Sequence, residues 1–298
     1  MMKINTITIG IAGMLLMGTG CDIKDPIYYT PHPDHGKIVL TTEWSNRSVG
    51  IEIPDCYTVQ VGNYREEVSG TTSVLDYLFE AGTHAVHIYN PSEHITVEGT
   101  VARVSQVAGR NEADEASFIY PTPEWFFSCA TEVTVEKDHV HTLTASMRQQ
   151  IRQLTLVVEP EGVEPDQILS IEGWLTGVAG ELDIDHDLHT GTSDVALDFA
   201  RIDEGADTGK WSVTVRMLGI SGTDQTLCTR LYLAGSGSDA IRVDSDLSAA
   251  LSDFNGNKKT PLSLTARLVI VPDPEVEAGF TATIEDWKTG GGGSGIAT

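Results

Sequence analysis

The sequence has few basic residues and no long apolar run. Lysine and arginine total 19 against 43 aspartate and glutamate residues, which gives a formal net charge of −24. A surface with this charge repels nucleic acid and anionic lipid headgroups, so neither is expected as a partner. The longest apolar stretch, "INTITIGIAGMLLM", is shorter than the ~18 residues that a membrane-spanning helix needs. These shortages argue against a nucleic-acid-binding protein and against a transmembrane helix.

Signatures of common enzyme classes are missing as well. There is no HExxH or CxxC motif, and no glycine-rich loop leads into a predicted helix as nucleotide binding requires. The "GSGSD" stretch at 235–239 lacks the strand-to-helix context of a nucleophile elbow. We therefore predict no enzymatic activity and no cofactor. The His-x-x-His spacings fall on predicted strands or loops, where positions three apart face opposite ways: His32/His35, His84/His87 and His186/His189.

One acidic segment, "ELDIDHDLHTG", is a weak candidate for a metal site. On a strand, Asp183, Asp185 and Asp187 would project from one face and could collect a hard cation such as Ca²⁺. The segment does not match an EF-hand loop, because the sixth position counted from Asp183 is Leu188 instead of glycine. A solvated acidic strand face is the favoured interpretation, and no metal is expected.

Cysteine is scarce, with four residues in the chain. If Cys21 is modified, three remain, and an odd number allows at most one intramolecular bridge. Cys56 and Cys129 fall in the same predicted domain and are therefore the candidate disulfide pair. Three unpaired thiols, with Cys228 as the third, are an equally weighted alternative.

The N-terminus resembles a bacterial lipoprotein signal peptide over residues 1–20. Lys3 precedes the apolar run, and Gly18, Thr19 and Gly20 stand directly before Cys21, as in a lipobox. We predict that the Cys21 thiol is acylated, that cleavage makes Cys21 the first mature residue, and that the lipid anchors the chain in the outer membrane at the cell surface. Each methylene buried in lipid contributes about 0.8 kcal/mol. An ordinary signal peptide with an incidental cysteine is the alternative.

The rest of the chain is dominated by short strand signals. Residues 21–35 carry three prolines and are predicted to form an extended tether. Segments rich in β-branched and aromatic residues then recur, closed by turn residues and without a βαβ rhythm, which predicts an all-β protein built of sandwiches. The expected strands are 36–45, 49–54, 57–62, 84–90, 94–104, 150–162, 168–185, 193–203, 209–221, 225–235, 261–273 and 278–290, with a hairpin over 124–147 that turns at Lys137–Asp138.

The pattern restarts near residues 148–151, which predicts two domains. The N-terminal sandwich is expected over 36–148 and the C-terminal sandwich over 149–290, followed by a flexible glycine-rich tail at 291–298. Residues 73–82 are one of few helix-like segments. Most tryptophans are expected in the core, and a platform for glycan stacking is the alternative: Trp44, Trp125, Trp174, Trp211 and Trp287.

Several of these segments together resemble a known family. They are the lipobox cysteine, the proline-rich tether, "GKIVLTTEWS", the mid-chain "HTLTASMRQQIRQLTLVVEPEG" and the terminal "FTATIEDWKTGGGGSGIAT". The arrangement is similar to the fimbrillin-like (FimB/Mfa-type) anchor and accessory lipoproteins of Bacteroidetes type V fimbriae. The resemblance implies two tandem transthyretin-like, Greek-key β-sandwich domains. It also implies fimbrial subunits as partners, bound by strand complementation.

The expected function is therefore a structural one. We predict a lipid-anchored fimbrial anchor or accessory subunit of the outer membrane, with a role in cell adhesion. Stalk subunits of the family are trimmed at a basic residue near the first strand, but Arg47 and Arg65 lack the inter-strand context for that cleavage. The alternative is a surface glycan-binding lipoprotein of a polysaccharide uptake system, which would use exposed tryptophans.

Overall fold

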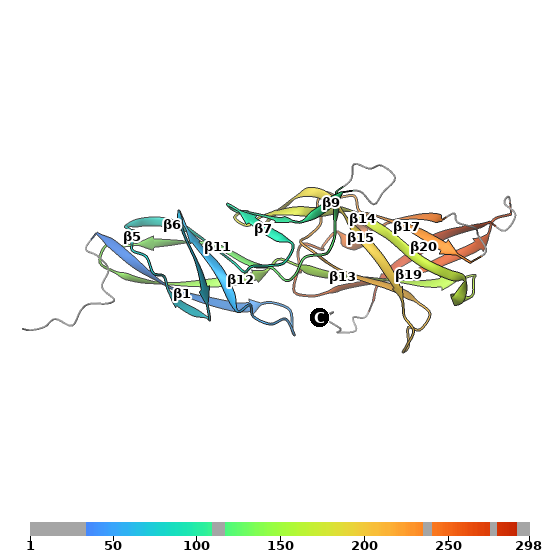
Figure 1. Cartoon of the computed structure of the whole chain (residues 1–298), viewed down its shortest axis with the longest axis horizontal. Helices are drawn as coiled ribbons and strands as arrows, with labels where there is room; N and C mark the ends of the chain where they lie inside the picture. The colour runs from blue at the N-terminus through green and yellow to red at the C-terminus, as the bar shows by residue number, and fades with distance from the viewer. Residues whose placement is uncertain (1–33, 109–116, 235–239, 275–278, 291–298) are drawn as a thin grey trace, which may run out of the picture.

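The structure is a computed structural model of the chain that describes residues 34–108, 117–234, 240–274 and 279–290. Cys21, the tether up to residue 33, the "GSGSD" stretch and the tail at 291–298 lie outside the described residues. The molecule is elongated, with one sheet toward each end (Figure 1). The described helices are α1 (Ser248–Leu251) and the 3₁₀ turn η1 (Pro165–Gln167). The all-β prediction is confirmed, and the tandem Greek-key arrangement stays a prediction.

The smaller sheet has eight strands and belongs to the first half of the chain. Its order is β3-β2-β6-β11-β12-β1-β4, and β5 also pairs with β1. Alternate side chains of β1 are buried, and they join a hydrophobic cluster that contains Trp44, Tyr57 and Phe127. The bounds are β1 (His35–Asn46), β2 (Cys56–Val61), β3 (Tyr64–Ser69), β4 (Thr72–Val74), β5 (Phe79–Glu80), β6 (Gly82–Tyr89), β11 (Phe127–Val135) and β12 (Val140–Gln149).

Strands β11 and β12 differ from the predicted hairpin. They pair only at Phe127–Gln149 and Ser128–Arg148, the end far from the turn. The two strands separate toward their turn because β1 runs parallel to β12 along most of its length. The start of β1 therefore lies beside the turn that joins β11 to β12. Gly36 is needed there, because a Cβ at that position would lie 2.4 Å from Cγ1 of Val135.

The larger sheet has twelve strands that surround one hydrophobic cluster. Its main path is β18-β17-β14-β15-β16-β13-β19-β20. The two end strands come together, since Trp287 on β20 donates its Nε1–H to Oγ of Ser245 on β18 at 2.8 Å. The bounds are β13 (Arg152–Glu161), β14 (Ile168–Asp183), β15 (Leu188–Arg201), β16 (Trp211–Met217), β17 (Thr226–Leu233), β18 (Ile241–Asp246), β19 (Leu262–Pro272) and β20 (Phe280–Thr289).

Four short strands from the first half of the chain also join the larger sheet. They are β7 (Ile95–Glu98), β8 (Val101–Val104), β9 (Gln106–Ala108) and β10 (Ser117–Ile119). Strand β8 pairs antiparallel with β14, and β10 pairs parallel with β15. The chain therefore crosses to the larger sheet, returns for β11 and β12, and crosses again at residues 150–151. The division into two domains at residues 148–149 stays a prediction.

A buried arginine holds the chain at this second crossing. The side chain of Arg152 donates to the carbonyl oxygens of Thr260, Asp253 and Phe254 at 2.8–3.2 Å. Burial lowers the pKa of its guanidinium group. Because the carbonyls belong to the loop between α1 and β19, Arg152 fixes that loop against the start of β13.

Most predicted strands are confirmed, with differences that have local causes. Residues 49–54 form a loop instead of a strand, and residues 73–82 form β4, β5 and turns. Strands β3 and β18 were not predicted, because charged side chains on both hide the apolar alternation. The turn at residues 184–187 interrupts the predicted 168–185 strand at Asp183.

Candidate functional sites

The cysteines of the described chain are free thiols, and the proposed Cys56–Cys129 pair is not formed. Cys56 lies on β2 and Cys129 on β11, with β6 between them. Two strand spacings amount to about 9.6 Å, beyond the ~7 Å Cα separation that a disulfide spans. Burial raises the pKa of the Cys129 thiol, and it raises the pKa of Cys228 to about 11 with a further contribution from Asp244.

The three aspartates of the acidic segment do not share a strand face. Asp183 is the last residue of β14, whereas Asp185 and Asp187 lie in the tight turn at residues 184–187, and Asp187 adopts a left-handed backbone conformation with φ 51°. Each carboxylate has its own partner: Asp183 binds His186, Asp185 binds His87, and Asp187 lies near basic side chains. Within the described part of the chain, no three His, Cys, Asp or Glu side chains gather as a metal site.

This turn instead connects the two sheets. His87 of β6 donates its Nε2–H to Oδ1 of Asp185 at 2.6 Å. On the other side of the turn, Asp187 lies 3.8 Å from Arg148 of β12 and 3.7 Å from Lys258. A polar cavity of about 440 Å³ lies between the turn and the exposed side of β11 and β12. The acidic segment is therefore a contact between the sheets, which no local sequence signal could show.

Lys258 is the most unusual cation of this junction. Its side chain is 9 % exposed, and Nζ donates to Oε1 of Gln150 at 2.7 Å and to Nε2 of His189 at 2.9 Å. Burial lowers the Lys258 pKa to about 8, and Asp187 partly opposes this. Burial and then the Lys258 charge lower the pKa of His189 to about 4, so the imidazole is neutral and Nε2 accepts. Lys258, Gln150 and His189 therefore form a buried polar network at the junction of the two sheets.

The free edges of the sheets are candidate interfaces for added strands. Among the described residues, β20 pairs only with β19, which leaves a ten-residue edge. Its first half, "FTATI", carries no charge, and Phe280, Ala282 and Ile284 are half-buried against the core cluster. Uncharged edges with unpaired backbone groups are templates for strand addition.

The other edges are better protected. Strand β3 carries Arg65, Glu66 and Glu67, and β18 carries Arg242 and Asp244, where charges oppose edge-to-edge pairing. Strand β4 has only three residues. Of the edge strands described, β20 therefore offers the longest uncharged segment to a partner.

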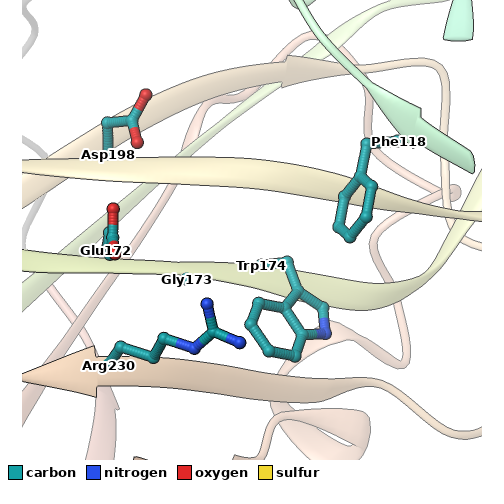
Figure 2. A pocket seen from close by; sticks show the side chains of 6 residues that line it. All are labelled: Phe118, Glu172, Gly173, Trp174, Asp198 and Arg230. Carbon is teal, nitrogen blue, oxygen red and sulfur yellow. The ribbon is translucent and has the colours of Figure 1, made fainter. Parts of the chain in front are cut away.

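A depression on the outer face of the larger sheet brings together aromatic and charged side chains (Figure 2). Its volume is about 260 Å³, and Trp174 lies at one end with Phe118 beside it. The charged groups come from three adjacent strands: Glu172 on β14, Asp198 on β15 and Arg230 on β17. Trp44 and Trp211 are buried core residues as predicted, whereas Trp125, Trp174 and Trp287 are half-buried.

No helix in the described ranges is long and apolar enough to cross a membrane. The predicted lipid attachment at Cys21 lies outside these ranges and stays a prediction. The His84/His87 spacing forms no shared site: His84 binds the carbonyl of Glu80, while His87 reaches the turn of the larger sheet.

Comparison with known proteins gives one family and a set of similar folds. The family model of the fimbrillin-A associated anchor proteins Mfa1 and Mfa2 matches residues 68–289. The fold is similar to the fimbrial anchor protein Mfa2 from Porphyromonas gingivalis, with TM-score 0.53, 12% identity and coverage of 83% of this chain and 95% of that one. No curated protein sequence matches the chain.

Two further solved structures, described as candidate adhesins, share the fold. One from Bacteroides ovatus has TM-score 0.59 and 13% identity over 86% of this chain and 94% of that chain. One from Bacteroides thetaiotaomicron has TM-score 0.52 and 15% identity over 87% of this chain and 98% of that chain. At these identities the structures establish similarity of fold alone.

Proposed function

The chain belongs to the family of fimbrillin-A associated anchor proteins Mfa1 and Mfa2, and from this premise we propose that it is a lipid-anchored anchor or accessory subunit of a surface fimbrium. The observation that carries the proposal is the family match over residues 68–289, which includes every strand from β4 to β20. The role is structural and needs no catalytic step.

Membrane attachment is assigned to Cys21. The lipobox-like "GTGC" supports acylation of this thiol, and the residues up to 33 would separate the lipid from β1. Two or three acyl chains make a stable anchor, because one chain alone binds only reversibly. The acidic charge of the chain leaves the lipid as the main attachment to an anionic bilayer.

Binding of the fimbrial subunit is assigned to the edge of β20. A donated strand would pair with the free backbone groups of β20 and cover the half-buried side chains of Phe280, Ala282 and Ile284. Strand β18 lies on the other side of this edge, joined to it by the Trp287–Ser245 hydrogen bond. The incoming strand would therefore enter between β20 and β18 and displace that bond.

A photo-crosslinking experiment tests the strand site. A photoreactive amino acid at Thr283, exposed on β20, is compared in intact cells with one at Thr72, exposed on the short edge β4. We expect a crosslink to a fimbrial subunit from position 283 and none from position 72. Crosslinks from 72 alone, or from neither position, would contradict strand addition at β20.

A second experiment tests the anchor. In Cys21→Ala cells, fimbrial material should appear in the medium, while wild-type cells retain it. Retention of the fimbriae by Cys21→Ala cells would refute the anchoring role, whatever the crosslinking result. Lipidation itself is read from the mass of the mature N-terminal peptide.

A further inference from the structure

We propose that one end of the smaller sheet, which exposes a tyrosine and a leucine, lies in the zwitterionic headgroup layer of the membrane to which the chain is tethered. We call it the aromatic end, and its residues are Tyr64, Tyr77, Leu78 and Phe79. The inference rests on the proposed lipidation of Cys21 and goes beyond it, because the folded chain itself makes a second contact with the bilayer.

The aromatic end lies where the described chain begins. Strand β5 pairs with the start of β1, with Phe79 opposite Gly36, and β5 lies at one extremity of the elongated molecule (Figure 1). The turn between β11 and β12 is at the same extremity, since the amide of Asp138 donates to the carbonyl oxygen of His35 at 2.8 Å. The start of β1, the loop between β4 and β5, and this turn therefore form one end of the protein.

The tether brings this end to the membrane. Thirteen positions separate Cys21 from Asp34, the first described residue, and so short a chain spans at most about 45 Å. The other end of the twelve-residue strand β1 is about 36 Å farther along the molecule. A lipid on Cys21 therefore keeps the aromatic end nearer to the bilayer than the rest of the smaller sheet.

The rings of the aromatic end form a packed set with an exposed side. Tyr77 stacks on Tyr64 with ring centroids 4.9 Å apart, and Phe79 meets these two rings edge-on at 4.9 and 5.4 Å. Phe79 is buried, whereas Tyr77 is 51 % exposed and Leu78 is 39 % exposed. A buried ring thus holds two adjacent apolar side chains at the surface. Tyrosine, with an apolar ring and a polar hydroxyl, is favoured at membrane–water interfaces.

Exposed apolar side chains are concentrated at this end of the molecule. Val140 on β12 lies opposite Lys37 near the start of β1, and Val74 on β4 lies opposite Val39. Among the described residues, eleven large apolar side chains are exposed, and four of them belong to this end: Val74, Tyr77, Leu78 and Val140. Exposed apolar residues scattered singly need no explanation, but a group of them marks an interaction site.

The charges beside the aromatic end select the headgroup. The exposed carboxylates of Asp76 and Glu80 flank Tyr77 and Leu78 in the sequence, with no basic residue between them. These carboxylates, in a chain with a net charge of −24, repel an anionic lipid surface. A zwitterionic headgroup instead offers a quaternary ammonium group, which is attracted by carboxylates and by the face of a tyrosine ring.

The test uses the lipidated full chain, purified from cell membranes and reconstituted with phosphatidylcholine vesicles. A fluorescent amino acid replaces Leu78 or, as the matched control, Val49, which is 94 % exposed and follows the far end of β1. Quenching by phosphatidylcholine that is brominated close to the headgroup reports contact with the bilayer. We expect severalfold stronger quenching at position 78 than at position 49.

A second comparison tests the tyrosine. Tyr77→Ser should reduce the quenching at position 78, whereas Tyr120→Ser, which removes an exposed tyrosine outside the aromatic end, should leave it unchanged. The comparison of positions 78 and 49 stands even where Tyr77→Ser does not fold. Equal quenching at positions 78 and 49, or none at position 78, would overturn the proposal.

Two other outcomes separate this contact from its alternatives. Blue-shifted emission at position 78 before vesicles are added would overturn the proposal, because residues 22–33 of the chain or a second copy would then cover the aromatic end. Flotation with the vesicles tests the lipid anchor by itself. A chain that floats without quenching at position 78 keeps the proposed anchor and loses only this contact, whereas a chain that does not float refutes both.

Discussion

Replacing Lys258 with methionine should change how the stability of the protein depends on pH. The Lys258 ammonium group is almost fully buried at the junction of the sheets, where Gln150, His189 and Asp187 are its partners. Methionine has a similar length and removes only the titratable charge and its hydrogen bonds. The comparison of wild type with Lys258→Met therefore isolates the proton equilibrium of one side chain.

The expected magnitude follows from the shift in pKa. In the folded protein the Lys258 pKa is lowered from 10.5 to about 8, chiefly by burial. Between pH 8 and 10.5 the unfolded chain binds more protons at this site than the folded one, so the free energy of unfolding rises with pH. At ~1.4 kcal/mol per pKa unit, wild type should gain about 3 kcal/mol relative to Lys258→Met across this window.

Urea denaturation of both proteins at several pH values from 7 to 10.5 measures this difference. Thiols and tyrosines titrate in both proteins and cancel in the subtraction. Lys259→Met, which removes the exposed neighbouring lysine, is the matched control for loss of one charge. A wild-type minus Lys258→Met difference that stays level over the whole range would refute the reasoning, because it would mean that water reaches Lys258 and the junction is open.

Three further predictions concern stability and redox chemistry. Thiol titration of the unfolded, unreduced protein should find Cys56 and Cys129 both free, and a reductant should leave the melting temperature unchanged. A diagonal gel that shows the two cysteines linked would contradict the strand order. Gly162→Ala should lower the free energy of unfolding by about 3 kcal/mol in urea denaturation, since φ at Gly162 is +94° and a Cβ would lie 2.0 Å from the Ile270 carbonyl oxygen. An unchanged urea midpoint would be inconsistent with this geometry. Arg152→Met should cost about 3 kcal/mol, because the carbonyls of Asp253, Phe254 and Thr260 lose their donor and that of Phe254 is buried. Faster amide exchange at 253–260 should accompany it; a variant as stable as wild type would show that water replaces the guanidinium.

The strands of the larger sheet were predictable because their signal is local. Through the middle of β13 and β19, buried and half-buried residues alternate with period two, which the sequence displays directly. Segment 49–54 shows the limit of that signal. "VGIEIP" has strand composition, but the structure pairs it with no neighbouring strand among the described residues.

The candidate sites were less predictable, because they depend on which strands become neighbours. The acidic segment predicts a solvated strand face, with a metal site as the less favoured alternative, but in the structure the turn at Asp185 meets His87, which lies 98 residues away in the sequence. The depression on the larger sheet brings Phe118 from β10 and Arg230 from β17 into contact with Trp174. No spacing in the sequence links these residues.

The sequence by itself determined the all-β class, the main strands, the acidic surface and the likeness to a fimbrial anchor family, because composition, period-two alternation and turn residues act over a few neighbouring positions. Only the tertiary structure decided that β1 lies parallel to β12, that β7–β10 join the larger sheet, and that Lys258 is buried between the two sheets. Those outcomes depend on contacts between segments far apart in the chain, where burial and charge pairing in three dimensions select one arrangement among many that the local pattern allows.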